Sequence, residues 1–237
     1  MKTVLHRSTT RGYTNHGWLE SHHSFSFAEY RDPNRMYFGA LRVLNDDIVQ
    51  GGKGFGMHPH DNMEIVSIVL KGTLKHTDGM GNNHVIKEND IQVMSAGTGL
   101  MHSEFNNHPK DKTEFLQIWV FPNKRNVEPR YDQIELNTAN RMNTFEQILS
   151  PNNEDQGVWI HQDAWFFRSD MDEGKELYYT FKKPGNGLYV FVLEGDVTIL
   201  DQALNKRDGF GIWDLDECKI HANTAAELLL MEIPMEL

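Results

Sequence analysis

Residues 54–82 read GFGMHPHDNMEIVSIVLKGTLKHTDGMGN, and this stretch sets two histidines directly before a β-rich run that is interrupted by a glycine. Side chains two residues apart on a strand lie on the same face, so His58, His60 and Glu64 point one way if the segment is extended without a bulge. The same rule places His102 and Glu104, in GTGLMHSEF, on one face of a second segment. We therefore expect two strands to bring three imidazoles and one or two carboxylates to one point.

The rest of the chain has the sequence pattern of an all-β protein. Short runs rich in β-branched and aromatic residues recur between turn signals, at 36–44, 64–77, 90–97, 114–121 and 187–200. Clusters such as DGMGNN and SPNNEDQG supply the turn residues between them. Residues 137–151 are ambiguous, because their apolar positions approximate a helical stripe while NTFEQIL can also pair as a strand.

One weak internal repeat indicates how the strands are organised. VSIVLKGTLKH (66–76) aligns with YVFVLEGDVTI (189–199), each with an apolar run, a glycine and a further strand. Two copies of one β-unit predict two antiparallel, jelly-roll-like β-barrels in tandem. Pro122 and Pro129 bracket a charged connector between the copies. We therefore expect the boundary near residue 130, with an N-terminal metal-binding domain over 1–130 and a C-terminal domain without metal ligands over 131–237.

Composition and charge restrict the class of protein. The chain has 237 residues, 39% of them hydrophobic, which is ordinary for a soluble globular protein. We expect neither a membrane span nor a secretory signal, because no run approaches the roughly 20 apolar residues of a span and the first residues contain no apolar stretch. Its single cysteine, Cys218, excludes an internal disulfide and suits a reducing compartment, so we expect a cytoplasmic protein. The net charge of −11 disfavours direct binding to nucleic acid or to anionic lipid.

The histidine clusters predict a site for one divalent metal ion. Imidazole and carboxylate together suit borderline ions such as iron, nickel, copper, cobalt, manganese or zinc, and fewer than six protein ligands leave room for substrate. No cysteine lies near the clusters, which disfavours a closed structural zinc site. Taken alone, His-x-His is common and often belongs to a solvated strand. The second cluster, with the same spacing, favours metal binding over that interpretation.

Several longer stretches closely resemble the pirin family. They are HGWLESHHSFSFAEYRDPNRMYFGALRVLNDD (16–47), GFGMHPHDNMEIVSIVLKGTLKHTDGMGN (54–82) and SAGTGLMHSE (95–104), and within the family they are most similar to the bacterial pirin-like quercetin 2,3-dioxygenases. The resemblance implies a bicupin fold with one metal ion, usually iron(II), in the N-terminal barrel.

The resemblance also implies a set of ligands. The family's metal ligands fall on His58, His60, His102 and Glu104. The wider cupin pattern favours Glu64 as a ligand, but here seven residues rather than six separate Glu64 from Gly72, and pirins use the later glutamate. We therefore expect Glu104 to be the fourth ligand, and Glu64 to contact the ligands from outside or to act as a catalytic base. The second barrel is expected to lack metal, with His221 as the one remnant of its second motif.

The activity implied by the resemblance is cleavage of a flavonol such as quercetin by dioxygen, with release of carbon monoxide. Glu104 and Glu64 are the candidate catalytic residues, since a nearby carboxylate would accept the proton of the substrate hydroxyl. The main alternative is a metal- or redox-dependent protein-binding module, as the resemblance to pirins of higher organisms implies, and another cupin reaction is a third option. We expect a monomer, because two joined barrels cover each other's open faces.

Overall fold

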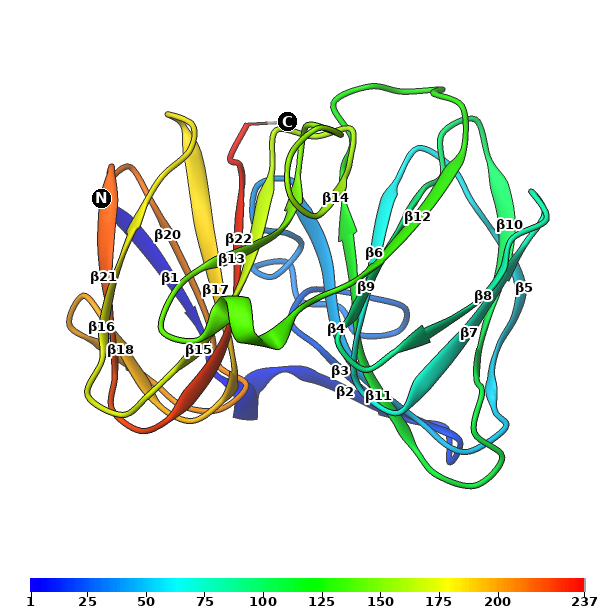
Figure 1. The fold of residues 1–237 in the computed structure, drawn as a ribbon, viewed down its shortest axis with the longest axis horizontal. Helices are drawn as coiled ribbons and strands as arrows, with labels where there is room; N and C mark the ends of the chain where they lie inside the picture. Colours follow the sequence, from blue (N-terminus) through cyan, green and yellow to red (C-terminus); the bar gives the residue numbers. More distant parts are fainter. Residues whose placement is uncertain (237) are drawn as a thin grey trace.

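The computed structural model describes residues 1–236, and its regular secondary structure is almost entirely strands, arranged as two β-sandwiches side by side (Figure 1). In the first sandwich, a seven-stranded sheet has the order β12 (Arg130–Glu135), β9 (Asp90–Ser95), β6 (Glu64–Lys71), β11 (Thr113–Val120), β4 (Leu41–Val49), β3 (Leu19–His23) and β2 (Gly12–Asn15). The facing sheet has four strands, β5 (Gly54–His60), β10 (Leu100–Asn106), β7 (Thr73–Asp78) and β8 (Asn83–Lys87).

The second sandwich repeats this division into seven and four strands. Its larger sheet has the order β1 (Lys2–His6), β20 (Gly209–Trp213), β17 (Asn186–Glu194), β22 (Ala226–Pro234), β15 (Trp165–Met171), β13 (Glu146–Ser150) and β14 (Val158–Trp159). Its smaller sheet has the order β16 (Glu176–Thr180), β21 (Glu217–Ala222), β18 (Val197–Ile199) and β19 (Gln202–Leu204). Two 3-10 turns, η1 (Ser8–Thr10) and η2 (Thr138–Arg141), complete the regular structure of the described residues.

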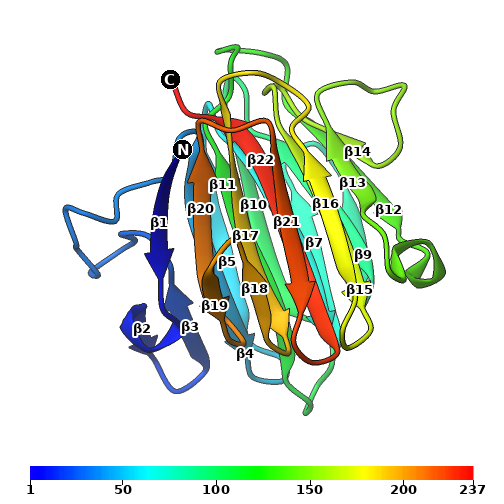
Figure 2. The ribbon, with the colours of Figure 1, turned by 90° about the vertical axis from the view of Figure 1, so that its left-hand side faces the viewer.

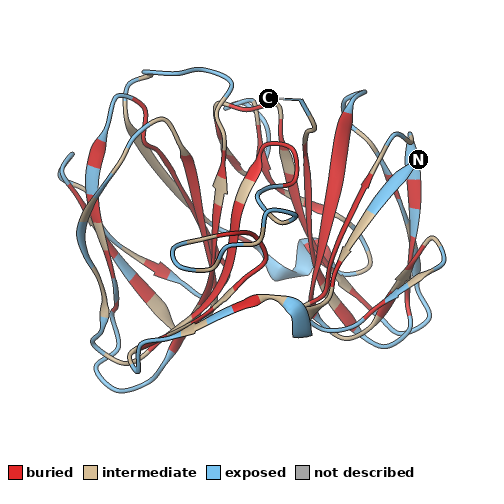
Figure 3. Ribbon diagram, turned by 180° about the vertical axis from the view of Figure 1, so that it is seen from behind, coloured by how far each residue is buried: buried red, intermediate tan, exposed pale blue. Residues whose placement is uncertain are grey.

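The two seven-stranded sheets share one hydrophobic core. That core contains side chains from both sandwiches, among them Val66 and Ile68 of β6 and Phe191 and Leu229 of β17 and β22. The buried positions therefore lie mostly along the central strands (Figure 3). Because both faces of β6 and β11 are covered, these strands read as nearly continuous apolar runs. One face packs against the other sandwich, and the opposite face points into the strand's own sandwich.

The predicted all-β bicupin fold is confirmed, with one correction to its shape. Each unit is an open sandwich of two separate sheets rather than a closed barrel. The internal repeat corresponds to β6 and β7 in one sandwich and to β17 and β18 in the other. Gly72 and Gly195 join these pairs at φ values of 83° and 78°, in the left-handed region that a residue without Cβ adopts most readily.

Three other expectations can be compared with the strands. The run at 36–44 becomes a strand only at Leu41, because Phe38 and Leu41 exchange two backbone hydrogen bonds of 2.9 Å in a turn. The ambiguous segment forms η2 and then β13.

The domain boundary near residue 130 stays a prediction. The N-terminal strand β1 pairs with β20 of the second sandwich, as Figure 2 shows, while β12 pairs with β9 of the first, so the chain crosses between the sandwiches more than once.

Candidate metal centre

Strands β5 and β10 bring the three predicted imidazoles together. The strands are antiparallel neighbours, with His102 opposite His58 and Leu100 opposite His60. The ring centroid of His58 lies 4.9 Å from that of His60 and 4.4 Å from that of His102, and the centroids of His60 and His102 are 4.9 Å apart. One nitrogen from each ring lies within 4.8 Å of the other two. This is the convergence that the shared strand parity predicts.

The environment of His102 suits a metal ligand. Its side chain is buried, and neither ring nitrogen has a hydrogen-bond partner among the described residues. A buried polar atom without a partner is costly, and an ion between the rings would satisfy it. Burial, reinforced by the neighbouring His58 and His60, lowers the pKa of His102 to about 2. The imidazole is therefore neutral at physiological pH, which is the form that binds metal.

The rings of His58 and His60 are also in a state that can bind a metal ion. The Nδ1 atom of His58 lies 2.7 Å from the carbonyl oxygen of Gly56, so it donates its proton there and leaves Nε2 free. Burial, followed by the neighbouring His58, lowers the pKa of His60 to about 4. Residues of this kind fit a borderline divalent ion.

Glu104 lies beside this trio rather than within it. A bulge between His102 and Glu104 shifts the register, so that Glu104 lies opposite Phe55. Its buried carboxylate accepts hydrogen bonds from Ser67 Oγ at 3.0 Å and from Gln117 Nε2 at 2.7 Å. Burial raises the pKa of Glu104 to about 7, although both hydrogen bonds oppose the shift.

A second group of possible ligands overlaps the first. Glu104 and His102 offer ligand atoms within 4.8 Å of each other and of the buried His76, so His102 belongs to both groups. His76 donates from Nε2 to Asp78 Oδ2 at 3.1 Å, and its Nδ1 has no partner among residues 1–236. The sequence did not single out His76, because it lies outside both histidine motifs.

Glu64 is directed away from the three histidines, contrary to the parity expectation. Asn62, with a φ of 45°, turns the chain between β5 and β6, so the segment from His58 to Glu64 is not one extended strand. Glu64 shares its parity with Val66, which faces the core between the sandwiches, whereas Ser67 faces Glu104. The buried Glu64 carboxylate accepts a hydrogen bond from Ser95 at 2.7 Å.

Replacement of Glu64 by glutamine is expected to flatten the pH dependence of stability. Burial raises the pKa of the Glu64 carboxyl from 4.5 to about 7, against the effects of Ser95, Arg130 and a backbone hydrogen bond from His161. The folded state therefore holds a proton that the unfolded state releases, so stability falls as the pH rises between these two values. Relative to Glu64→Gln, the wild type should lose up to about 3 kcal/mol between pH ~5 and pH ~8 in urea titrations. If the unfolding free energies of the wild type and Glu64→Gln changed in parallel with pH, the raised pKa of Glu64 would be contradicted.

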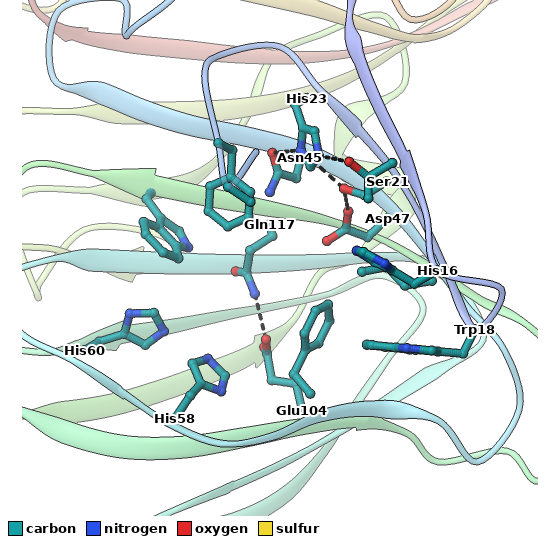
Figure 4. A pocket seen from close by; sticks show the side chains of 16 residues that line it. His16, Trp18, Ser21, His23, Asn45, Asp47, His58, His60, Glu104 and Gln117 are labelled. Atoms are coloured by element: carbon teal, nitrogen blue, oxygen red, sulfur yellow. Dashed lines mark hydrogen bonds between the residues drawn. The ribbon is translucent and has the colours of Figure 1, made fainter. Parts of the chain in front are cut away.

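A cavity of about 250 Å³ opens beside the histidines, slightly below the range of roughly 300 to 1,000 Å³ typical of small-molecule sites. His58, His60 and Glu104 line one end of it (Figure 4). The walls are aromatic and consist of two edge-to-face pairs, Trp18 with Phe55 at 5.3 Å and Phe27 with Trp119 at 5.4 Å. The cavity therefore suits a flat aromatic molecule.

Several polar residues at or beside the cavity belong to no motif in the sequence. A row of polar side chains crosses the large sheet in register, in the order His23, Asn45, Gln117 and Ser67, and it continues to Gln92. Each is a polar residue at an inward position of a mainly apolar sheet. The available signal was a single glutamine within the apolar run FLQIWV, but strand partners are needed to see that these residues align.

The second sandwich has a different interior. Hydrophobic side chains fill it, including Phe167, Leu188, Val190 and Ile220. His221 lies at its smaller sheet, with Nδ1 at 3.5 Å from a carboxylate oxygen of Glu176. It belongs to neither of the two groups of possible metal ligands found among residues 1–236.

Comparisons with known proteins agree with this architecture. The Pirin family model matches residues 5–120, and the model for the quercetinase C-terminal cupin domain matches residues 147–233. The chain is 39% identical to quercetin 2,3-dioxygenase of Escherichia coli K12, with 97% of this chain and 98% of that protein covered. It is 37% identical to a pirin-like protein of Caulobacter vibrioides, over 93% and 95% of the two chains.

A solved structure gives the same result in three dimensions. The crystal structure of the bacterial pirin YhhW from Escherichia coli in complex with nickel(II) superposes with a TM-score of 0.93 at 38% identity, covering 98% of this chain and 99% of that one. Among the described residues, no helix is long and apolar enough to cross a membrane. The sequence matches, the paired sandwiches and the clustered histidines agree, and the chain belongs to the pirin family.

Proposed function

We propose that the protein is a metal-dependent dioxygenase that cleaves a flavonol-type substrate such as quercetin and releases carbon monoxide. The observation that carries the proposal is the buried His102, whose unpartnered nitrogens lie against His58 and His60. His58 and His60 in turn line one end of an aromatic cavity. The relatives named as quercetin 2,3-dioxygenases support the substrate class.

His58, His60 and His102 would hold the ion, with Glu104 as the fourth ligand. Iron(II) is our proposed metal, although nickel, copper, cobalt, manganese and zinc accept the same donors, and the nickel(II) complex of the Escherichia coli pirin supports an ion of this type. When bound, the ion supplies a Lewis acid for the neighbouring 3-hydroxyl and 4-keto oxygens of a flavonol.

The protein's own groups would bind the substrate and move its proton. Trp18, Phe55 and Trp119 would cover the flavonol rings and exclude water. The Glu104 carboxylate would accept the proton of the 3-hydroxyl group, because it lines the cavity beside His58 and His60. Ser67 and Gln117 would keep that carboxylate in place. Glu64 has no such role in this proposal, since it does not line the cavity.

Removal of the metal is expected to abolish activity and to lower stability. Chelator-treated protein should lose flavonol-dependent oxygen uptake and carbon monoxide release, and one equivalent of the functional ion should restore both. A ligand at one hundred times its Kd stabilises the folded state by about 2.7 kcal/mol, so the melting temperature should also fall on chelation. The test is elemental analysis of the purified protein, with oxygen uptake measured on a flavonol panel after each metal is restored.

Two outcomes would count against the proposal. Undiminished turnover by metal-free protein would exclude a metal-dependent reaction. A stoichiometric metal without turnover on any flavonol would exclude this substrate class and favour the protein-binding module.

A further inference from the structure

The cavity has a second polar end, away from the three histidines. Ser21 and His23 of β3 lie opposite Asp47 and Asn45 of β4, and all four side chains are buried. They line the same cavity as His58 and Glu104, and Figure 4 shows them gathered across it from these two residues. The aromatic walls thus connect two polar ends.

The hydrogen bonds among these four side chains use only some of their donors and acceptors. His23 donates from Nδ1 to Asn45 Oδ1 at 2.8 Å and accepts a hydrogen bond from Thr14 Oγ1 at 3.3 Å. Ser21 donates its hydroxyl proton to Asp47 Oδ1. These contacts leave Asn45 Nδ2 as a donor and Asp47 Oδ2 as an acceptor without side-chain partners among the described residues. The cavity therefore presents one free donor and one free acceptor at this end.

A purely structural role explains this cluster poorly. The second carboxylate oxygen of Asp47 opens onto the cavity rather than into the packed core, because it is not among the fully enclosed unpartnered atoms of the described residues. Burial of the residue raises the pKa of Asp47 to about 7 despite the hydrogen bond from Ser21, so placing a carboxyl group here is costly. Apolar residues would close a sandwich at lower cost, as they do in the second sandwich. A neighbouring donor and acceptor match two adjacent phenolic hydroxyls, because one can donate to Asp47 while the other accepts from Asn45.

We propose that Asp47 and Asn45 form a hydroxyl-binding subsite that selects polyphenols carrying hydroxyl groups on the ring remote from the three histidines. The inference rests on the proposed function, which places the keto and hydroxyl oxygens of a flavonol at the histidine end. It adds a specificity element at the opposite end.

The test compares quercetin with galangin, the same flavonol without the two hydroxyls on its pendant ring. Wild-type kcat/KM should favour quercetin by about tenfold or more, as expected for a site with buried hydrogen-bonding groups. Asp47→Asn keeps an acceptor for Ser21 but removes a carboxylate oxygen. It should reduce the preference to threefold or less by lowering kcat/KM for quercetin, with galangin within about twofold of wild type. Asp201→Asn, an exposed site in the second sandwich, carries the same change of charge and should keep the wild-type preference.

Binding to metal-free protein separates this inference from the proposed function. Quenching of tryptophan fluorescence should show quercetin binding at least fivefold more tightly than galangin, and both Asp47→Asn and Asn45→Ala should remove that difference. Asn45→Ala also serves as the test if Asp47→Asn fails to fold. Equal wild-type affinity for the two flavonols, or an equal loss for both in the variants, would overturn the subsite. Differential binding without turnover would retain the subsite and contradict only the dioxygenase.

Discussion

The His102→Ala variant is expected to lose its metal and its activity together. Three imidazoles converge within 4.8 Å, and His102 is the one whose two nitrogens are buried without partners. Without it, His58 and His60 are the two remaining ligands of the trio, both on β5. We expect less than one tenth of the wild-type metal content and a fall in kcat/KM of roughly 10³-fold or more. Elemental analysis and oxygen uptake with quercetin measure the two quantities on one sample.

His221→Ala is the matched control, because it removes a histidine of the second sandwich that is not grouped with possible ligands. It should keep wild-type metal content and turnover. The metal-free His102→Ala protein should remain folded, since the deleted ring makes no hydrogen bond. Full metal content with normal oxygen uptake in folded His102→Ala protein would contradict the ligand assignment.

The Glu104→Gln variant should separate metal binding from proton transfer. The neutral amide is close to the carboxylate in size, but it cannot take a proton from a flavonol hydroxyl. It also presents an NH₂ group to Gln117 or Ser67, where the carboxylate accepts hydrogen bonds. We expect kcat to fall by roughly 10² to 10⁴-fold, the range typical of a lost general base, while His58, His60 and His102 retain most of the metal.

The matched control is Glu88→Gln, which makes the same change at an exposed position outside the cavity. Its kcat and metal content should equal those of the wild type. A folded, metal-loaded Glu104→Gln protein with wild-type kcat would show that Glu104 does not accept the proton. Loss of all metal in the Glu104→Gln protein would instead show that Glu104 acts only as a metal ligand.

The strands and their repeat could be predicted because the relevant signals are local. Apolar runs, turn clusters and the glycines at 72 and 195 lie within short windows. The pairing of β1 with β20 joins residues about two hundred positions apart, and no local pattern encodes it. The repeat predicted two jelly-roll-like barrels, and the structure contains two such units, but it does not encode whether the sheets of each unit join at their edges, and here they stay separate.

The candidate site likewise combines features that local sequence patterns predict with features that depend on long-range strand pairing. The convergence of His58, His60 and His102 follows from parity, since β5 and β10 pair regularly between His58 and His60 and between Leu100 and His102. Parity fails at Glu64 because Asn62 breaks the extended segment. The polar row from His23 to Ser67 depends on which strands are neighbours and in what register, so it becomes visible only in three dimensions.

We expect one metal ion to lie among the imidazoles of His58, His60 and His102. Anomalous diffraction from crystals of the metal-loaded protein, recorded on both sides of the absorption edge of that metal, tests it most directly. We predict one strong peak per chain within bonding distance of all three rings, and none in the second sandwich. A peak at another position, or no peak in protein shown by elemental analysis to contain the metal, would contradict the claim.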